Sequence, residues 1–193
     1  MLRYVVLTLG TLLLSTTLWA QSSTKFILKE PAELKVSVPT SVGVIKGVLR
    51  VSSVDLKGPA GWNRFAFKIK LAPSSFSSGD ALRDRYVREQ ILKAHLGDIS
   101  FYALERIAPA RDEDGQPVGL PKAKGWLDPA RQGAYLEIPY QWRKEEDGGI
   151  LEITHQVPLK SVGLQSLKHP FVDVTGPVTL RLKANMVRLS SLK

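Results

Sequence analysis

The chain has 193 residues, of which 44% are hydrophobic and 23% are charged, a balance typical of one globular domain and not of a disordered chain. It contains no cysteine, which excludes disulfides, thiolate metal sites and thiol nucleophiles and leaves an apolar core as the source of stability. The formal net charge of +9 favours anionic partners, but the basic residues are scattered and no nucleic-acid-binding motif accompanies them, so we expect no nucleic acid partner.

The first 20 residues have the pattern of a secretory signal peptide. Arg3 gives a positive start, residues 4–18 are uncharged and mostly apolar, and Ala20 supplies a small residue before polar Gln21. The alternative, a membrane anchor, would need about 20 apolar residues, and this run is shorter and interrupted by serine and threonine. We therefore expect cleavage after Ala20 and a mature chain, residues 21–193, that forms one domain and is periplasmic or secreted.

Most of the mature chain alternates apolar and polar residues with a period of two, which is typical of strands that bury one face. This alternation predicts strands at 34–38, 45–51, 65–71, 99–103, 136–142, 151–157 and 180–186. Additional strands at 26–29 or 124–127 bring the number to about eight, at which an antiparallel sheet can close into a barrel. A two-sheet β-sandwich fits the same alternation and remains the alternative.

Turn residues separate these segments. Asp147-Gly148-Gly149 predicts a hairpin between 134–143 and 150–157, because two glycines after an aspartate favour a tight turn. The segment 112–115, Asp-Glu-Asp-Gly, predicts another turn. The protein is therefore expected to be an all-β fold made of antiparallel neighbours.

Residues 78–94 instead have a helical pattern. Ser77-Ser78-Gly79-Asp80 fits a capping box, in which a serine accepts a backbone N–H and an acidic side chain reaches back. The opposite charges of Arg85 and Glu89, and of Glu89 and Lys93, are four residues apart. One apolar face is formed by Tyr86, Val87, Ile91 and Ala94. We expect one helix that begins near Ser78 and lies against an end of the barrel.

Arg83 falls on the apolar face of this helix, whereas Asp84 falls toward its charged side. In one interpretation the Arg83 stem lies along the apolar surface with its guanidinium in water. In the other, the guanidinium hydrogen-bonds to carbonyls or a carboxylate and anchors the helix on the barrel. Both interpretations stay open, and Arg83 and Tyr86 are the candidate structural anchors.

Two stretches resemble a known family. The segment NRFAFKIKLAPSSFSSGD, followed by Arg83-Asp84, Val87 and the strand with Ile99 and Phe101, resembles the YceI-like family of secreted barrels, and GPVTLRLKANM is similar to its last strand. Tyr86 and Val87 stand where family members commonly have histidine and leucine. The resemblance implies an all-β, antiparallel, eight-stranded, lipocalin-like barrel with one helix between strands. It also implies an elongated apolar cavity that binds a long isoprenoid or similar lipid without catalysis.

The inward faces of the predicted strands would line such a cavity. His155 shares this inward face and could hydrogen-bond a polar ligand head, although a satisfied core histidine is the alternative. Inward side chains can also fill a small barrel completely, so a solid core remains open. The predicted lining residues are Val36, Val38, Phe65, Phe67, Ile69, Leu71, Phe101, Leu136, Ile138, Tyr140, Trp142, Ile153, His155, Leu180 and Leu182.

The sequence carries no GxSxG elbow, HExxH pair, Walker loop or GxGxxG motif, and its three histidines lack close metal-ligand spacing. We therefore expect no catalytic residue, cofactor or metal. The leading hypothesis is a secreted or periplasmic carrier of an apolar lipid such as a polyisoprenoid. The alternative is an envelope or surface protein with a filled barrel, whose basic exterior binds anionic polymers or transiently contacts membrane or envelope anions.

Overall fold

The computed structural model describes residues 24–58, 65–92, 94–127, 134–158 and 174–189. The predicted signal peptide, residues 1–20, and Lys93 of the predicted helix lie outside these ranges. Within the described ranges, no helix combines the length and the apolar character needed to cross a membrane.

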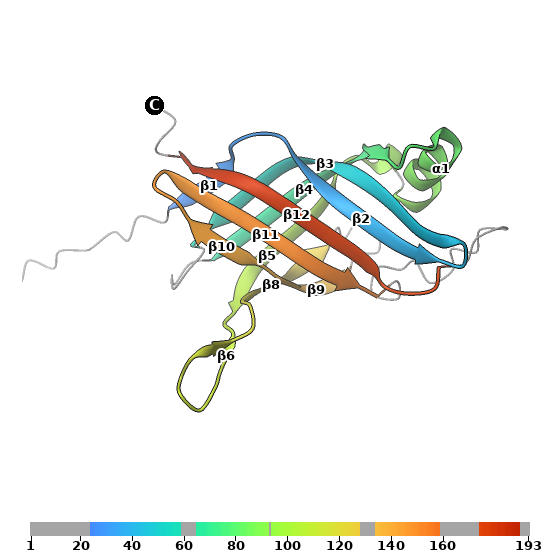
Figure 1. The fold of residues 1–193 in the computed structure, drawn as a ribbon. Coiled ribbons are helices and arrows are strands. Elements are labelled where there is room, and N and C mark those ends of the chain that lie inside the picture. Colours follow the sequence, from blue (N-terminus) through green and yellow to red (C-terminus); the bar gives the residue numbers. More distant parts are fainter. Residues whose placement is uncertain (1–23, 59–64, 93, 128–133, 159–173, 190–193) are drawn as a thin grey trace, which may run out of the picture.

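The described residues form antiparallel strands and one helical segment (Figure 1). Alternation explains the strands: in the last strand Leu182, Ala184 and Met186 are buried while the residues between them are exposed. The strands are β1 Lys25–Leu28, β2 Ala32–Thr40, β3 Gly43–Lys57, β4 Ala66–Ser77, β5 Ile99–Ile107, β6 Ala110–Arg111, β7 Pro117–Val118, β8 Lys122–Leu127, β9 Ala134–Pro139, β10 Gln141–Lys144, β11 Gly148–Val157 and β12 Val178–Arg188. The helical segment consists of α1 Ala81–Tyr86, the π-helix η1 Val87–Ile91 and the 3₁₀ turn η2 Ala94–Leu96.

One sheet of ten strands has the order β10-β11-β12-β1-β3-β4-β5-β8-β9, and β2 also pairs with β12 and β3. β1 and β2 are successive segments that occupy the same place between β12 and β3. β9 and β10 are separated only by Tyr140, yet they pair with β8 and β11 at opposite ends of the strand order. Counting each of these couples as one position leaves eight positions, the number predicted from the sequence.

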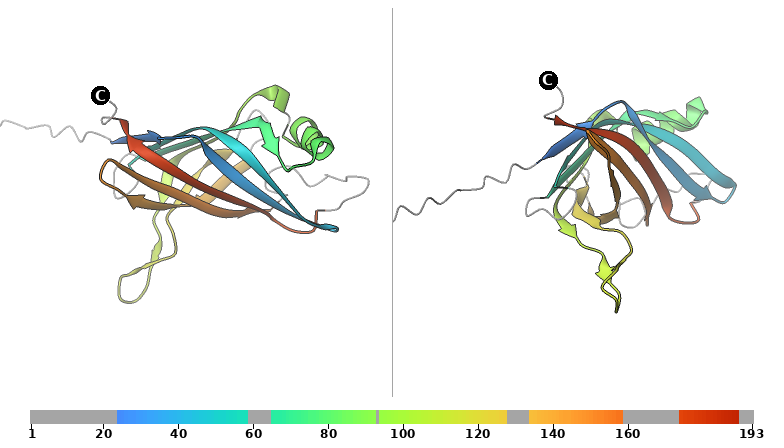
Figure 2. Two further views of the ribbon diagram at one scale, coloured as in Figure 1. Left: turned by 45° about the horizontal axis from the view of Figure 1, so that its top comes forward. Right: turned by 60° about the vertical axis from the view of Figure 1, so that its left-hand side comes forward.

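The sheet curls into a barrel (Figure 2) because its two ends meet where β9 runs directly into β10. The last residue of β11 that pairs with β10 is Glu152. Among the described residues, no backbone pairing joins β9 to residues 153–157 of β11, so the hydrogen-bonded wall is interrupted there. The predicted all-β antiparallel architecture, with a helix between two strands, is confirmed.

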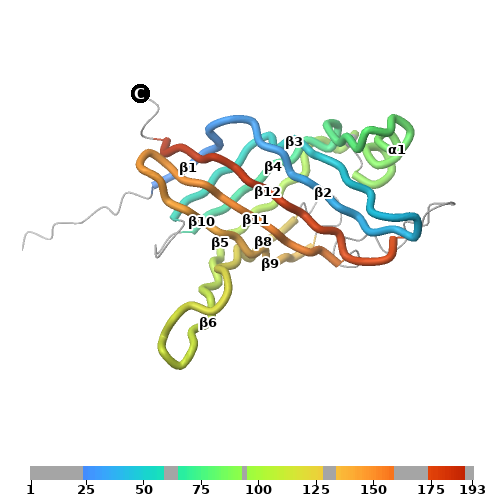
Figure 3. Tube along the Cα trace, in the orientation of Figure 1, coloured from blue at the N-terminus to red at the C-terminus, as the bar shows by residue number. Residues whose placement is uncertain are grey.

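The barrel has two ends. The helix end carries α1, the turn between β2 and β3, the end of β11 and the start of β12 (Figure 1). The far end carries the turn between β10 and β11 and the start of β1, and there β1 lies beside β12 (Figure 3). The β6–β7 hairpin around the predicted turn at 112–115 projects away from the barrel.

The helical segment begins later than predicted. In the predicted capping box Asp80 reaches back to a capping serine, but in the structure Asp80 is itself the N-cap of α1, and its carboxylate accepts the N–H of Arg83 at 3.0 Å. The hydroxyl of Ser78 instead donates to the Asp84 carboxylate and accepts a hydrogen bond from Nε of Arg83. The segment also changes winding after Tyr86, where the α-helix gives way to η1.

The predicted hairpin is present, but its limits differ. Tyr140 splits the predicted strand 134–143 into β9 and β10, and only β10 pairs with β11. Gly148 and Gly149 begin β11, so the turn consists of residues 145–147. A Cβ on Gly148 would lie 2.0 Å from the carbonyl oxygen of Met186. The glycine is therefore needed for close approach of β12 more than for the turn.

Candidate functional site

Aromatic side chains fill the interior of the barrel toward its far end. The Phe67 ring is 1% exposed, and its centroid lies 6.0 Å from those of both Phe101 and Tyr140. Phe65 stacks on Tyr140 with centroids 6.0 Å apart. The rings of Phe26 in β1 and Trp142 in β10 also contact each other, with centroids 4.8 Å apart. This aromatic cluster leaves the far half of the barrel packed as a core.

Tyr140 holds the cluster at the point where β9 becomes β10. Its hydroxyl accepts a hydrogen bond from Nε of Arg106 at 3.2 Å. Burial raises the pKa of Tyr140, and the charge and hydrogen bond of Arg106 only partly oppose this effect. The phenol therefore stays neutral and gives the packed half a polar contact to β5.

Toward the helix end, the same inward faces become less buried. On seven strands an inward-facing residue is buried, and the next inward-facing residue toward the helix end, two positions along the strand, is half-buried. The pairs are Leu34 to Val36, Ile69 to Leu71, Phe101 to Ile99, Gly125 to Leu127, Leu136 to Ala134, Ile153 to His155 and Leu182 to Leu180. The interior therefore changes along the barrel from a filled core to an apolar surface that is incompletely covered.

The helical segment lies over part of this apolar surface. Val87 and Leu92 pack against the core, and Tyr86 and Ile91 are half-buried, as predicted for the inner face of the helix. Leu82, by contrast, is 83% exposed on α1. One side of the segment therefore packs on the barrel next to β4, and the other side carries the exposed ion pair between Arg85 and Glu89, 3.2 Å apart.

A polar network fastens α1 to the end of β4. Oδ1 of Asp84 accepts hydrogen bonds from the backbone N of Ser78 at 2.8 Å and from its hydroxyl at 2.5 Å. The Arg83 guanidinium donates to the hydroxyl and carbonyl oxygen of the same serine at 2.7 and 3.1 Å. The Arg83 guanidinium therefore makes a carbonyl contact, but locally at Ser78, and its role as an anchor of the helix on the barrel stays a prediction.

Asp84 differs from its predicted position on the charged side of the helix, because it is 6% exposed. Burial alone would raise its pKa, but the hydrogen bonds from Ser78 and the charge of Arg88 outweigh burial and hold the pKa of Asp84 below its ordinary value. Arg88 itself donates to the carbonyl oxygen of Asp84 at 3.1 Å. The aspartate is therefore a charged, satisfied anchor.

The predicted lining residues divide between the two halves of the barrel. Nine are buried: Phe65, Phe67, Ile69, Phe101, Leu136, Ile138, Tyr140, Ile153 and Leu182. Six are half-buried: Val36, Val38, Leu71, Trp142, His155 and Leu180. Except for Trp142, which packs on Phe26, the half-buried group lies toward the helix end. Contact of any of these residues with a ligand stays a prediction.

His155 is the polar residue of the predicted lining set in the incompletely covered region. Burial, followed by the positive charge of Lys122, lowers the pKa of His155. The imidazole is therefore neutral at neutral pH, with one ring nitrogen able to donate and the other able to accept.

Sequence reasoning missed Phe76, which is 5% exposed on the helix-end part of β4. A Cβ on Gly47 would lie 2.5 Å from the Phe76 ring, so the glycine in β3 leaves the space that this ring occupies. A glycine within an otherwise alternating apolar strand was the available signal. Phe76 and Val157 are buried although they lie toward the helix end.

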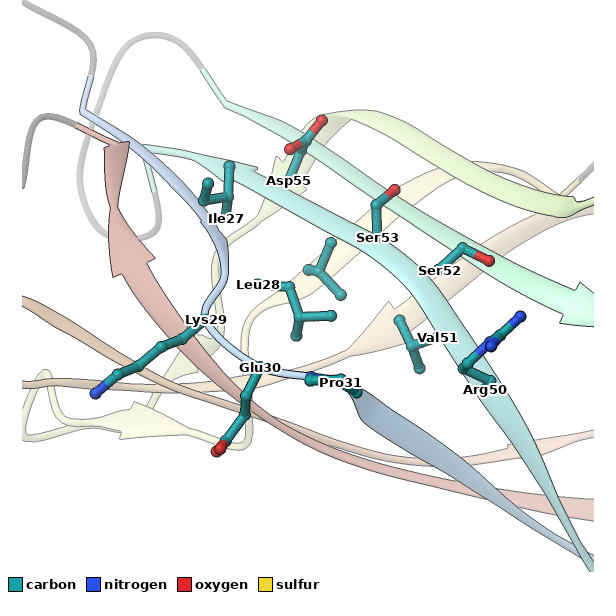
Figure 4. Close-up of a pocket in the computed structure, with 11 residues that line it drawn as sticks. Ile27, Leu28, Lys29, Glu30, Pro31, Arg50, Val51, Ser52, Ser53 and Asp55 are labelled. Atoms are coloured by element: carbon teal, nitrogen blue, oxygen red, sulfur yellow. The ribbon is translucent and has the colours of Figure 1, made fainter. Parts of the chain in front are cut away.

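A separate groove lies in the barrel wall where β1 ends and β2 begins (Figure 4). It has a volume of about 640 Å³ and is open to solvent, with Leu28 and Val51 inside and Lys29 and Glu30 pointing away. Val51 and Val54 at its floor are buried. None of the predicted lining residues contributes to this groove, which results from the break between the two strands.

No cluster of three or more histidine, aspartate or glutamate side chains suited to a metal ion occurs in the part of the chain that the structure describes. The polar groups near the helix end, Arg83, Asp84 and Ser78, are used in structural hydrogen bonds. The polar side chains at the helix end therefore serve the fold, and the half-buried residues beside them are mostly apolar.

The chain has the fold of the YceI-like family. A similar solved structure is that of BcnA from Burkholderia cenocepacia, with a TM-score of 0.58 and 14% identity over 80% of this chain and 95% of BcnA. Another is a polyisoprenoid binding domain from Saccharophagus degradans implicated in plant cell wall breakdown, with a TM-score of 0.57 and 12% identity over 84% of this chain and 98% of that domain. Neither a protein-family model nor a curated protein matches the sequence.

Proposed function

We propose that this chain is a non-enzymatic, secreted or periplasmic binding protein that holds a long apolar molecule, such as a polyisoprenoid, inside its barrel. The ligand enters at the helix end. The observation that carries the proposal is the change of the inward faces from buried at the far end to half-buried apolar residues at the helix end. A chain-like molecule would complete this burial.

The chemistry of the helix half suits such a ligand. Val36, Leu71, Leu127 and Leu180 present aliphatic side chains there and pack against the core without closing it. Burying roughly 400 Å² of apolar ligand at about 25 cal/mol per Å² would contribute about 10 kcal/mol before the costs of association are subtracted. His155 would contact a polar head group. The interaction is mostly non-directional, so related lipids should also bind.

The similar fold of the Saccharophagus degradans domain supports an isoprenoid as the first ligand to test. Maturation after Ala20 is part of the proposal, since it delivers the barrel to the envelope. Intact-mass measurement of exported protein should show a chain that begins at or near Gln21, and retention of Met1 would contradict export by this route.

The ligand is tested by organic extraction of purified, folded protein and by titration with long-chain isoprenoids. A molecule of chain-like lipid should be recovered, and the titration should saturate. Leu180→Trp, which fills the helix half, should weaken binding about tenfold or more. Thr179→Trp is the matched control, because its neighbouring position in β12 faces outward.

The proposal fails if extraction yields no lipid and no isoprenoid shows saturable binding. It also fails if Leu180→Trp and Thr179→Trp bind equally, since the ligand would then lie elsewhere. The melting temperature of both variants, measured beside the binding assay, separates lost binding from lost folding. A failure would favour the alternative in which the barrel is filled and acts through its basic exterior.

A further inference from the structure

Three aromatic side chains form a row on the outer face of the barrel. In the register of the sheet Tyr102 of β5 lies opposite Trp126 of β8, which lies opposite Tyr135 of β9. Their exposed fractions are 46%, 54% and 48%. The Trp126 and Tyr135 rings contact each other with centroids 4.9 Å apart. We call these three residues the aromatic row.

The row is not explained by the packing of the barrel. It lies on the faces of β5, β8 and β9 that alternate with the buried residues Ala103, Leu136 and Ile138, so its side chains point away from the interior. Three adjacent aromatic side chains that are each about half exposed form a continuous apolar surface. Such surfaces on soluble domains commonly mark interaction sites.

Lysines border the row. Lys68 of β4 lies opposite Tyr102, and the Nζ of Lys124 lies 5.6 Å from the centre of the Tyr135 ring. The nearby carboxylates are already paired: Glu105 with Lys124 at 3.4 Å, Glu137 with Lys122 at 3.1 Å, and Asp55, which lies opposite Lys68 in β3, with Lys25 at 3.3 Å. Among the described residues, Lys68 and Lys70 have no ion-pair partner. The uncompensated charge beside the row is therefore positive.

We infer that the aromatic row, together with Lys68 and Lys70, docks the wall of the barrel on a membrane surface that carries anionic phospholipid head groups. Tyrosine and tryptophan rings have apolar bodies and polar tips, and they concentrate at the boundary between head groups and acyl chains. Lysines near an anionic membrane surface add electrostatic attraction that salt weakens. Both elements occur here side by side.

Charge favours a lipid surface over a neutral oligosaccharide as the partner. A neutral sugar gains no Coulombic attraction from uncompensated positive charge beside the rings, whereas an anionic head group does, and Glu105 and Glu137 are engaged with lysines. The free groups at the border are ammonium groups, which match phosphate. This inference goes beyond the proposed function and does not depend on whether the barrel holds a ligand.

The test is co-sedimentation of the mature, full-length protein with lipid vesicles. Vesicles of phosphatidylcholine mixed with phosphatidylglycerol should bind the protein, and added salt should weaken binding. Replacing Trp126 and Tyr135 together with serine should lower the partition coefficient about tenfold or more. Lys68→Ala and Lys70→Ala should each lower it about fivefold on anionic vesicles and leave weak binding to phosphatidylcholine unchanged.

The matched control replaces exposed apolar residues at the helix end, Val42 and Leu82, with serine. Their exposed fractions are 72% and 83%, so the control removes comparable apolar surface from a different face. Its partition coefficient should equal that of the unsubstituted protein. Circular dichroism and the melting temperature establish that each variant is folded.

A second measurement tests the inference even if the serine variants do not fold. Vesicles with brominated acyl chains should quench the fluorescence of the unsubstituted protein, and the quenching should fall strongly in the conservative variant Trp126→Phe. The inference is overturned if the protein binds no anionic vesicles, if the row variants bind as well as the control, or if Trp126→Phe leaves quenching unchanged. Binding to insoluble polysaccharide that the row variants lose, without vesicle binding, would assign the row to saccharides instead.

Discussion

The carboxylate of Asp84 accepts two hydrogen bonds from Ser78, one from its backbone N at 2.8 Å and one from its hydroxyl at 2.5 Å. These bonds join the first turn of α1 to the chain just after β4, across six residues of sequence. A carboxylate bound in this way is stable in its charged form although the side chain is 6% exposed. The attachment of α1 to the end of β4 therefore involves an ionised group.

Replacement of Asp84 by asparagine should reduce the free energy of unfolding by about 1–3 kcal/mol at neutral pH, because the charge-assisted bonds from Ser78 are weakened. The pKa of Asp84 is lowered from 3.8 in the folded protein. Its contribution is thus complete above the unfolded pKa and disappears as the pH falls through the lower folded pKa. Urea unfolding at neutral and at strongly acidic pH should show the difference between the two proteins shrinking in acid.

Glu89→Gln is the control for this experiment, since Glu89 lies in an exposed pair with Arg85. Its effect on unfolding should stay within about 0.5 kcal/mol. A constant difference between unsubstituted protein and Asp84→Asn at every pH would show that the charge of Asp84 contributes nothing to stability.

The Arg83 contacts predict a smaller effect. Arg83→Ala removes two hydrogen bonds to Ser78 and should cost about 1 kcal/mol, because the guanidinium is half-buried. Arg85→Ala, at a side chain that is 74% exposed, should have little effect. Equal denaturation midpoints for Arg83→Ala and the unsubstituted protein would contradict this prediction. They would mean that hydrogen bonds to water stabilise the guanidinium as much as those to Ser78 do.

His155 predicts a dependence on pH in a different range. Its pKa is lowered from 6.5 by burial and by Lys122, so the unfolded chain takes up a proton before the folded protein does. Stability should therefore fall as the pH drops from 6.5 toward the lower folded pKa. His155→Gln should remove this part of the fall, which we expect to be a few degrees of melting temperature at most, because the ring is only half-buried.

Melting curves at about pH 8 and about pH 5 measure the effect. The exposed His95→Gln is the matched control and should keep the pH dependence of the unsubstituted protein. If His155→Gln loses as much melting temperature on acidification as the control does, the burial of His155 has no energetic consequence.

The strands were predictable from sequence because alternation is a local property that burial on one face imposes on each strand separately. The segments 34–38, 45–51, 99–103 and 180–186 accordingly lie within β2, β3, β5 and β12. The split of the strand at Tyr140 was not predictable in the same way. It depends on two different neighbours, β8 and β11, and such pairing is a property of the whole sheet.

The helix shows the same limit. Its apolar face with Val87 was predicted from periodicity, whereas the burial of Asp84 was predicted wrongly, because a helical wheel cannot include the hydrogen bonds of Ser78 from the preceding chain. The aromatic residues were predicted to face inward, and Phe67 and Phe101 do. Their contact with one another, which fills the far half, depends on distances between strands that alternation does not specify.

The contrast between the filled and the incompletely covered half should be measurable as a contrast in stability. Phe67 is 1% exposed and contacts the rings of Phe65, Phe101 and Tyr140, so Phe67→Ala should cost about 3–5 kcal/mol through lost burial and the cavity left behind. Val38→Ala, at a half-buried position near the helix end, removes less buried surface and should cost about 1 kcal/mol or less.

Enlarging substitutions should show the opposite order of tolerance. Ala103 lies opposite Phe67 in the sheet and is 1% exposed, so Ala103→Leu has no space and should cost about 1–3 kcal/mol through overpacking. Leu180→Phe adds volume at a half-buried position and should leave the free energy of unfolding nearly unchanged or raise it, because the added ring covers apolar surface that water otherwise contacts. Urea unfolding of ligand-free protein measures both. Should Leu180→Phe destabilise as strongly as Ala103→Leu, the helix half would be as fully packed as the far half, and the space assigned to an apolar ligand would not exist.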